Sequence, residues 1–405
     1  MPSPEALRKK MHGKTLPEYR EVNGHIHTPY SFSAFNDVET AFRMANNEDI
    51  SVLGINDFFV TDGYDEFYGE SLKHKVFPLF NIEFIGLLQE EQKQGIRIND
   101  PNNPGRIYFC GKGLDYPFRP SASVKKQLDA VILESQDQIR QMISRLNNLF
   151  LSLNTSHKLS YDEVKKRFAQ DLVRERHLAK AVRFLAAENY ESDETRLRFL
   201  EALYGGKKSK IGISDNSALE NEIRSNLLKA GGAAFVEEDE SAFLELSRII
   251  KIIIESGGIP CYPVLLDDPK GSFTEFESNP EKLYNSLKSL NIGCIELIPG
   301  RNNHAILKSF AEYFFNKGFL VLFGTEHNTP EMIPLKVSAR GKEQLDNSLK
   351  NTGWRSACVV AGHQYLRAQN REGYLDQSGT PKAEERNYFE SLGQMVIEYF
   401  INESL

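Results

Sequence analysis

Residues 20–27 read REVNGHIH, and this run predicts a short β-strand that ends in two closely spaced histidines. Strands and helices alternate in the chain that follows it. A helix, a buried strand, a second helix and two apolar segments are expected over residues 37–46, 51–55, 64–73, 76–80 and 82–88. This alternation predicts successive βα units and a largely parallel sheet or barrel, whose functional loops follow the strand ends.

The middle of the chain has a different pattern. A further strand is expected over residues 106–110, but from residue 123 to about 230 the sequence is almost wholly helical. Apolar side chains recur at three- and four-residue steps from Val124 to Leu149, which predicts one amphipathic helix of about seven turns. We expect that helix to pack on its neighbours or to support a homodimer.

The strand and helix alternation then resumes. Helices are expected over residues 243–255, 281–290 and 305–316, and strands over residues 259–264, 294–298 and 319–323. Further helical segments occupy residues 340–405. The helical block is therefore interpreted as an insertion within an α/β unit.

Composition narrows the class of protein. The 405 residues allow two or three domains of roughly 150 residues, or one large barrel with insertions. A share of 40% apolar and 26% charged residues is typical of a folded globular protein. The net charge of -7 provides no general attraction to nucleic acid or anionic lipid, so neither is expected as a partner.

Several further features point to the cytoplasm. The four cysteines are widely scattered without CxxC spacing, which argues against a zinc ribbon and a disulfide framework. The first five residues, MPSPE, contain no apolar segment of a secretion signal. No run approaches the roughly 18 apolar residues that a membrane span needs.

The sharpest chemical signal is the pair His25 and His27. Side chains at i and i+2 of a strand point to one face, so both imidazoles can meet on a metal while Ile26 packs on the other side. An HxH motif alone is weak, because both histidines could equally be hydrogen-bonded strand residues.

Other potential ligands follow later strands. Asp57, Glu83 and the pair Glu326 and His327 each come after a predicted strand, and strand ends meet on one rim of a barrel. Each acid taken singly could be a surface carboxylate or a helix cap. Together with the histidines, they would suit zinc, manganese or iron, and a metal-bound hydroxide would attack a phosphorus or carbonyl centre.

These residues lie in segments that resemble the PHP (polymerase and histidinol phosphatase) superfamily over about residues 22 to 330. The resemblance rests on HIHTPYS (25–31), GINDFFVTDGYDEF (54–67), FNIEF (80–84), GGIPCYPV (257–264), GCIELIPGRNN (293–303) and LFGTEHNTP (322–330). Residues 159–182 are similar to the helical insertion of the branch that contains nucleoside monophosphate and oligonucleotide phosphoesterases.

The resemblance implies a distorted (β/α)7 barrel with metals at its C-terminal rim and hydrolysis of phosphate esters. It divides the chain into a barrel from residues 20–120 and 232–335, a helical insertion over 121–231 and a C-terminal helical extension over 336–405.

The metal ligands implied by the resemblance are His25, His27, Glu83, and Glu326 or His327. Aromatic residues stand where the family has further ligands, namely Phe32, Phe58, Tyr108 and Tyr262. We therefore expect one divalent ion, with two as the alternative. These aromatic side chains either fill a lost cavity or contact the substrate, and Tyr108 and Tyr262 are the candidate substrate contacts.

The insertion and one later loop offer groups that could hold phosphate. By the resemblance, His177 lies near the substrate with Arg174 or Arg176, and Arg301 is a second anion contact. Asp57, His177 and His327 are the candidate catalytic residues for proton transfer.

The sequence thus predicts a metal-dependent phosphoesterase that acts on a small phosphate ester with a reduced metal site. The alternative is a PHP-fold protein that binds a ligand or acts as a scaffold without cleaving anything. A repair or proofreading nuclease is disfavoured by the acidic balance of the chain.

Overall fold

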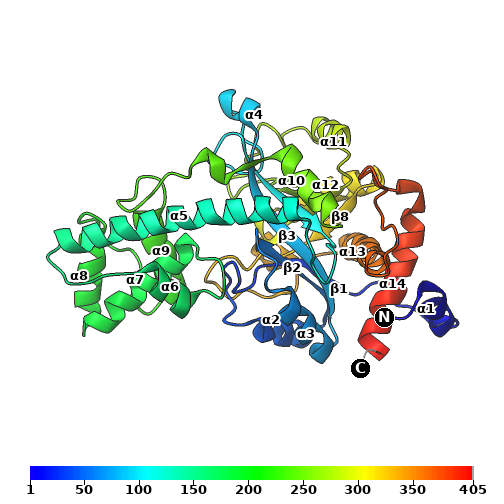
Figure 1. Cartoon of the computed structure of the whole chain (residues 1–405), viewed down its shortest axis with the longest axis horizontal. Coiled ribbons are helices and arrows are strands. Elements are labelled where there is room, and N and C mark those ends of the chain that lie inside the picture. Colours follow the sequence, from blue (N-terminus) through cyan, green and yellow to red (C-terminus); the bar gives the residue numbers. More distant parts are fainter. Residues whose placement is uncertain (404–405) are drawn as a thin grey trace.

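A computed structural model describes residues 1–403, and its centre is a sheet that curls into a nearly closed barrel (Figure 1). In order around the sheet the strands are β1 (Glu21–Ile26), β2 (Ile50–Phe58), β3 (Phe77–Leu87), β4 (Arg106–Lys112), β6 (Ile259–Val264), β7 (Cys294–Leu297) and β8 (Leu320–Phe323). The short β5 (Leu244–Glu245) pairs with β3. The end of β8 returns to β1, where His27 N donates to Glu326 O over 2.7 Å. The predicted α/β barrel is confirmed.

Strand direction differs from the prediction at one place. Strands β1 to β3 are parallel, as are β6 to β8, but β4 is antiparallel to both of its neighbours. The segment between β3 and β4 contains only the short α4 (Gln89–Lys93), and a reversed strand needs no long crossover helix. The barrel is therefore mixed rather than wholly parallel.

The two apolar segments expected over 76–80 and 82–88 form the single strand β3. Asn81, the polar residue between them, points into the barrel and is completely buried. Its side chain donates to Gly24 O over 3.1 Å and accepts from Gly113 N over 3.0 Å. These bonds allow a polar residue to continue an apolar strand.

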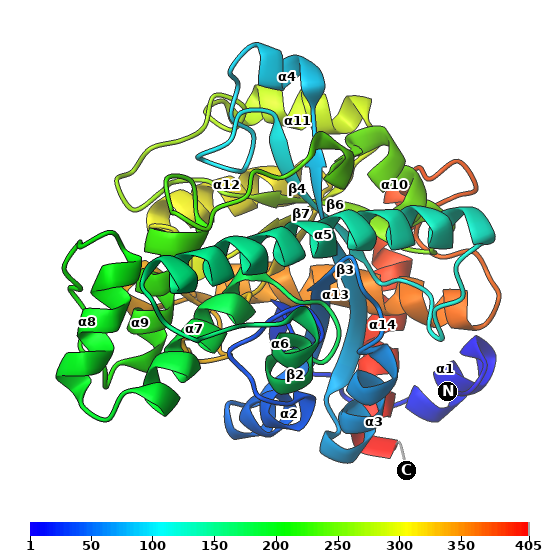
Figure 2. The same ribbon diagram turned by 60° about the vertical axis from the view of Figure 1, so that its left-hand side comes forward.

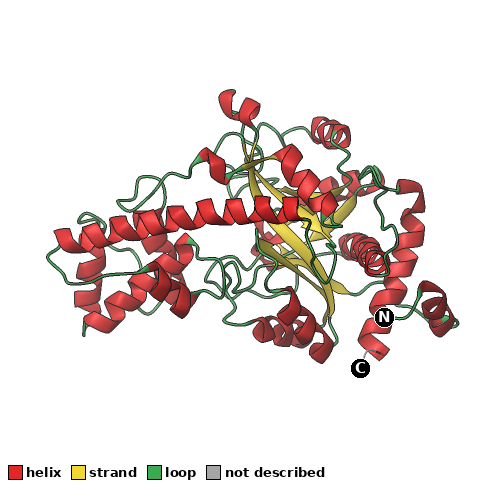
Figure 3. Ribbon diagram, viewed as in Figure 1, coloured by secondary structure: helices red, strands yellow, loops and turns green. Residues whose placement is uncertain are grey.

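Helices surround the strands on the outer face of the barrel, as Figure 3 shows by the red ribbons around the yellow core. These are α2 (Val38–Asn47), α3 (Tyr64–His74), α10 (Leu246–Glu255), α11 (Pro280–Ser289) and α12 (His304–Asn316). Asp37 caps α2 as predicted, because its Oδ1 accepts from Thr40 N over 2.7 Å.

The helical block projects to one side of the barrel as α5 (Ala122–Ser152), α6 (Tyr161–Phe168), α7 (Glu175–Asn189), α8 (Asp193–Leu203) and α9 (Asn216–Ile223) (Figures 1 and 2). The predicted apolar stripe of α5 serves two cores. Val124 and Val131 pack into the barrel core, whereas Met142 and Leu146 pack into the core of α6 to α9. The apolar stripe of α5 is thus buried against other parts of the same chain. The domain boundaries and the homodimer stay predictions.

The last helices belong to the barrel core. Helix α13 (Asn347–Ala368) lies between the strands and α14 (Arg386–Glu403), and its Trp354 packs with Leu79 and Leu322 (Figure 2). Its Gln364 accepts from Phe80 N and donates to Pro78 O, both at the start of β3. The helix α1 (Pro4–Met11) packs on α14, and β9 (Ser338–Ala339) and β10 (Glu343–Gln344) form a small ribbon. Helix α13 therefore closes the end of the barrel that is opposite the rim carrying the histidines.

Within residues 1–403, none of the helices has the length and apolar character that crossing a membrane requires.

The contact between α13 and α14 generates a stability prediction. A Cβ at Gly393 would overlap the carbonyl oxygen of Cys358, so Gly393→Ala must push the two helices apart. We expect the free energy of unfolding to fall by about 1–3 kcal/mol. In Gly69→Ala the new methyl meets nothing within 4 Å, and helix α3 should gain about 0.5–1 kcal/mol. Urea unfolding of both variants checks the prediction, and equal effects of the two substitutions would contradict it.

Candidate metal centre and anion-binding cleft

Three potential ligands converge at the rim of the barrel. His25 lies in β1, His27 directly follows this strand and Glu83 lies in β3, and all three side chains are buried. The two imidazole Nε2 atoms are 3.3 Å apart. Glu83 Oε2 lies 3.0 Å from His27 Nε2 and 3.5 Å from His25 Nε2. The structure thus brings together these three residues, which the sequence analysis named as metal ligands.

This triangle fits a metal ion. Ligand atoms about 2.0–2.1 Å from a tetrahedral zinc ion are roughly 3.3 Å apart, close to all three separations in the cluster. Glu83 Oε2 is buried and accepts no well-directed hydrogen bond despite its nearness to His27. A buried carboxylate oxygen without a donor is costly, and a cation would satisfy it. Three protein ligands leave a fourth position open.

The other ring nitrogens are held by a surrounding layer of polar groups. His25 Nδ1 lies 2.7 Å from Glu296 Oε2, and His27 Nδ1 lies 3.2 Å from Ser31 Oγ. Such hydrogen bonds fix the ring orientation, so both Nε2 atoms face the centre of the triangle. Carboxylates also act on the pKa of His25. Burial lowers it, but Glu296 and Glu83 outweigh burial and raise it to about 9.

Glu296, which holds His25, also forms a buried ion pair with Lys112. Lys112 Nζ donates to Glu296 Oε1 over 2.6 Å and to Asn56 Oδ1 over 2.9 Å, and neither charged side chain is exposed. Burial lowers the pKa of Lys112, but Glu296 outweighs that effect and raises it above its ordinary value. Sequence reasoning missed Lys112, Glu296 and Asn56. The available signal was Glu296 within the apolar strand CIEL. A charged residue in a buried strand indicates a partner of opposite charge, because such residues are rarely buried unless paired.

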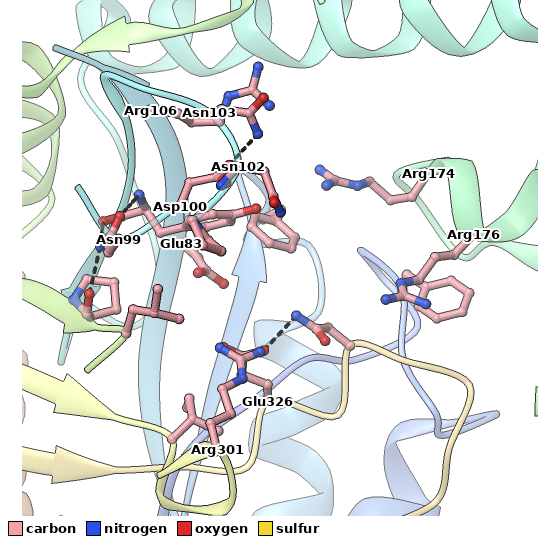
Figure 4. Close-up of a pocket in the computed structure, with 18 of the residues that line it drawn as sticks. Glu83, Asn99, Asp100, Asn102, Asn103, Arg106, Arg174, Arg176, Arg301 and Glu326 are labelled. Carbon is pink, nitrogen blue, oxygen red and sulfur yellow. Dashed lines mark hydrogen bonds and ion pairs between the residues drawn. The ribbon is translucent and has the colours of Figure 1, made fainter. Parts of the chain in front are cut away.

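Glu83 also lines a cleft of about 360 Å³ between the barrel rim and the insertion (Figure 4). Six cationic side chains line it, namely Arg106, Arg174, Arg176, Arg224, Lys229 and Arg301. Four carboxylates accompany them, from Glu83, Asp100, Glu175 and Glu326. The excess of positive groups suits an anion. Sequence reasoning missed Arg106, Arg224 and Lys229, which are distant from the quoted motifs.

The predicted substrate contacts divide into two groups. Tyr108, Arg174, Arg176 and Arg301 line the cleft. Tyr262 is completely buried outside the cleft lining, and its hydroxyl donates to Glu277 Oε1 over 2.7 Å. Tyr262 is therefore not brought together with the other predicted substrate contacts, because its one polar group is bonded inside the protein.

Glu326 and His327 do not join the ligand cluster, in contrast to the prediction. Both have left-handed backbone angles, with φ of 63° and 54°. Glu326 Oε2 accepts from Arg301 and Asn328. The His327 ring lies near Thr325 Oγ1 through Nδ1 and near Ile333 O through Nε2. Neither side chain is part of the three-residue group, and both ring nitrogens of His327 have partners within the protein.

Two other candidate catalytic residues are engaged structurally. Asp57 accepts from Thr28 N, Thr28 Oγ1 and Ser31 Oγ, so it fixes the loop after β1 and lies outside the cleft lining. Burial raises its pKa. His177 Nδ1 accepts from Arg174 N at the start of α7, and burial, with nearby cations, lowers its pKa to about 3. His177 also lies outside the cleft lining, and its role in proton transfer stays a prediction.

The rings of Phe58 and Phe32 are in contact with histidine and arginine side chains of the site. Phe58 stacks on His27 with ring centres 4.7 Å apart, and the Arg174 guanidinium lies 4.4 Å from the centre of the same ring. Phe32 contacts the His177 ring at 4.9 Å and the Arg176 guanidinium at 5.7 Å. The two phenyl rings therefore position side chains around the cleft and do not form an open stacking surface.

Comparisons with known proteins show a similarity of fold only. No protein-family model matches the chain, and no curated protein matches it. A protein assigned as a metal-dependent phosphoesterase, from Bifidobacterium adolescentis, is similar in structure with a TM-score of 0.54 and 14% identity, over 90% of this chain and 100% of that one. An amidohydrolase from Chromobacterium violaceum has a TM-score of 0.51 and 14% identity, over 82% of this chain and 96% of that one. At these identities the shared feature is the barrel-like fold.

The geometry predicts which histidines hold metal. In His25→Ala the cluster loses one of three ligand atoms, and we expect the affinity for Zn²⁺ or Mn²⁺ to fall by more than about 100-fold. In His327→Ala the affinity should stay within about 3-fold, because both ring nitrogens are already engaged and lie outside the cluster. Metal titration with a competing chelator measures both, and equal losses would contradict the assignment.

The depressed pKa of His177 predicts acid sensitivity. Between pH 6.5 and about 3 the unfolded chain binds a proton at this residue and the folded chain does not, so the free energy of unfolding falls as pH is lowered. From pH 7 to pH 5 this one group accounts for about 2 kcal/mol. His177→Gln keeps an acceptor for Arg174 N and removes the titration. Its stability should decline less over that interval in urea unfolding, and parallel declines would refute the prediction.

Proposed function

We propose that this protein is a metal-dependent hydrolase of a small phosphate ester, with one divalent ion held by His25, His27 and Glu83. The observation that carries the proposal is the three-ligand triangle whose Glu83 borders a cleft rich in arginine. A site with three protein ligands and an open position is typical of catalytic rather than structural metals. When bound, such an ion lowers the pKa of a coordinated water and polarises the substrate.

The chain's own residues perform the other tasks. The guanidinium groups of Arg174, Arg176 and Arg301 face the cleft and can bind phosphoryl oxygens through paired N–H donors (Figure 4). Glu296 and Ser31 hold the ligand imidazoles in place through their Nδ1 atoms. The binding of substrate phosphate is thus assigned to the insertion and the loop after β7, and ligand placement to the strands.

The comparisons add support of a general kind. The resemblance of the motifs to the PHP superfamily agrees with a barrel that carries ligands at its rim. One structural neighbour is described as a metal-dependent phosphoesterase, and the other was solved with bound sulfate, which has the shape and charge of phosphate. A cleft of about 360 Å³ suits a small ester better than a polymer.

The decisive experiment is a phosphatase assay on protein supplied with Mn²⁺, Zn²⁺ or Fe²⁺, using a panel of small phosphate esters. We expect metal-dependent release of phosphate that is lost in His27→Ala and kept in the matched control His12→Ala, whose side chain is exposed. Bound metal without release of phosphate from any ester would favour the alternative of a ligand-binding protein. Absence of metal binding after supplementation would overturn the proposal.

Arg176 provides a separate prediction about substrate binding. Burial and the nearby Arg224 lower its pKa to about 10, so it is a partly desolvated cation that still carries its charge at neutral pH. We expect Arg176→Gln to raise KM by about 10-fold or more, with a smaller effect on kcat. Arg198→Gln on the exposed face of α8 should leave both constants unchanged. Steady-state kinetics of the two variants checks the difference.

A further inference from the structure

One side of the triangle is lined by aromatic side chains that provide no anionic ligand atom. Phe58 on β2 is the register partner of Glu83 on β3, and both line the cleft. The Phe58 ring covers His27, and a phenyl group has no donor atom for a metal. The ring centre of Tyr108, on β4, lies 6.4 Å from that of Phe58, and burial raises the pKa of the Tyr108 hydroxyl. A second ion beside Glu83 would find no anionic ligand from these residues.

A cation of the protein lies over the Phe58 ring instead. Arg174, the residue before α7, places its guanidinium 4.4 Å from the centre of the Phe58 ring, which is within range of a cation–π interaction. Its ion pair with Glu175 is long, at 3.8 Å between Nε and Oε2. In Figure 4 the Arg174 side chain extends from the insertion into the cleft, on whose opposite wall Glu83 lies. Phe58 therefore links the ligand His27 to the guanidinium of Arg174.

We propose that Arg174, seated on Phe58, takes the place of a second metal ion, so that one bound cation and one guanidinium together neutralise the phosphate group of the substrate. A guanidinium can bind two phosphoryl oxygens at once and carries a permanent charge. Phe58 is then a positioning residue that acts through Arg174. This inference rests on the proposed function, because it assumes that phosphate binds beside the triangle.

The chain contains a matched control for this pair. Arg106 also lines the cleft, and its guanidinium lies 4.6 Å from the centre of the Phe243 ring. Unlike Arg174, Arg106 makes a short ion pair of 2.7 Å with Glu238. Phe243 lies outside the lining of this cleft. Phe243→Leu therefore removes an equivalent arginine–phenyl contact without touching the triangle.

The experiment measures inorganic phosphate binding to Mn²⁺-loaded protein by calorimetry, together with the metal content of each variant. We expect one Mn²⁺ per chain in the wild type and in every variant. Arg174→Gln should weaken phosphate binding by about 10- to 100-fold. Phe58→Leu should weaken it by about 3- to 10-fold, and Phe243→Leu by less than about 2-fold. In an Arg174→Gln background, Phe58→Leu should have no further effect.

The possible results separate this inference from the proposed function. Two ions per wild-type chain, or unchanged phosphate affinity in Arg174→Gln, would overturn the role of Arg174 and leave the hydrolase proposal standing. An undiminished effect of Phe58→Leu in the Arg174→Gln background would show that Phe58 acts through His27 and would equally overturn it. If Phe58→Leu does not fold, Arg174→Lys decides, because lysine keeps the charge without the planar fork and should bind phosphate more weakly than the wild type. Wild-type protein that binds no metal would instead refute the proposed function.

Discussion

The ammonium group of Lys112 is completely buried inside the barrel, and the polar centre of the molecule is built around the pairing of that charge. Glu296 supplies the partner carboxylate, and its second oxygen reaches His25. One carboxylate therefore joins three strands, β4, β7 and β1. Removing it would leave an unpaired buried cation, which costs far more than the pair contributes. The orientation of His25, and with it the geometry of the triangle, depends on this pairing.

The two ends of the barrel have opposite characters. Helix α13 closes one end with apolar side chains such as Trp354, so the strands below the ion pair are sealed from water. The other end opens into the arginine-lined cleft. Electrostatic interactions are stronger where water is excluded, so a cation at the triangle would lie at the boundary between a dry interior and a charged cleft. That position suits both tight metal binding and access for an anion.

The site is composite. The barrel supplies the imidazoles, from β1 and the residue after it, and Glu83 from β3, whereas the insertion supplies Arg174 and Arg176. Phe32 and Phe58, which line the rim, hold these arginines on their rings. The insertion is attached to the barrel through such contacts and through the shared helix α5, whose apolar stripe enters both cores. The relative placement of ligands and cations therefore follows from packing between two parts of the chain.

Local spacing was enough to predict much of this arrangement. The strand and helix pattern, the cap at Asp37 and the pairing of His25 with His27 depend on residues a few positions apart, where periodicity and backbone geometry act directly. Glu83 was also named as a ligand, although it was expected after a strand and lies within β3. What could not be read from spacing was the direction of a side chain after a strand ends. After the left-handed turn, Glu326 pairs with Arg301 and the His327 ring with Thr325 and Ile333, and a buried ion pair links Lys112 to a residue 184 positions away. Such choices are made by long-range packing and by the pairing of buried charges, which no local pattern contains.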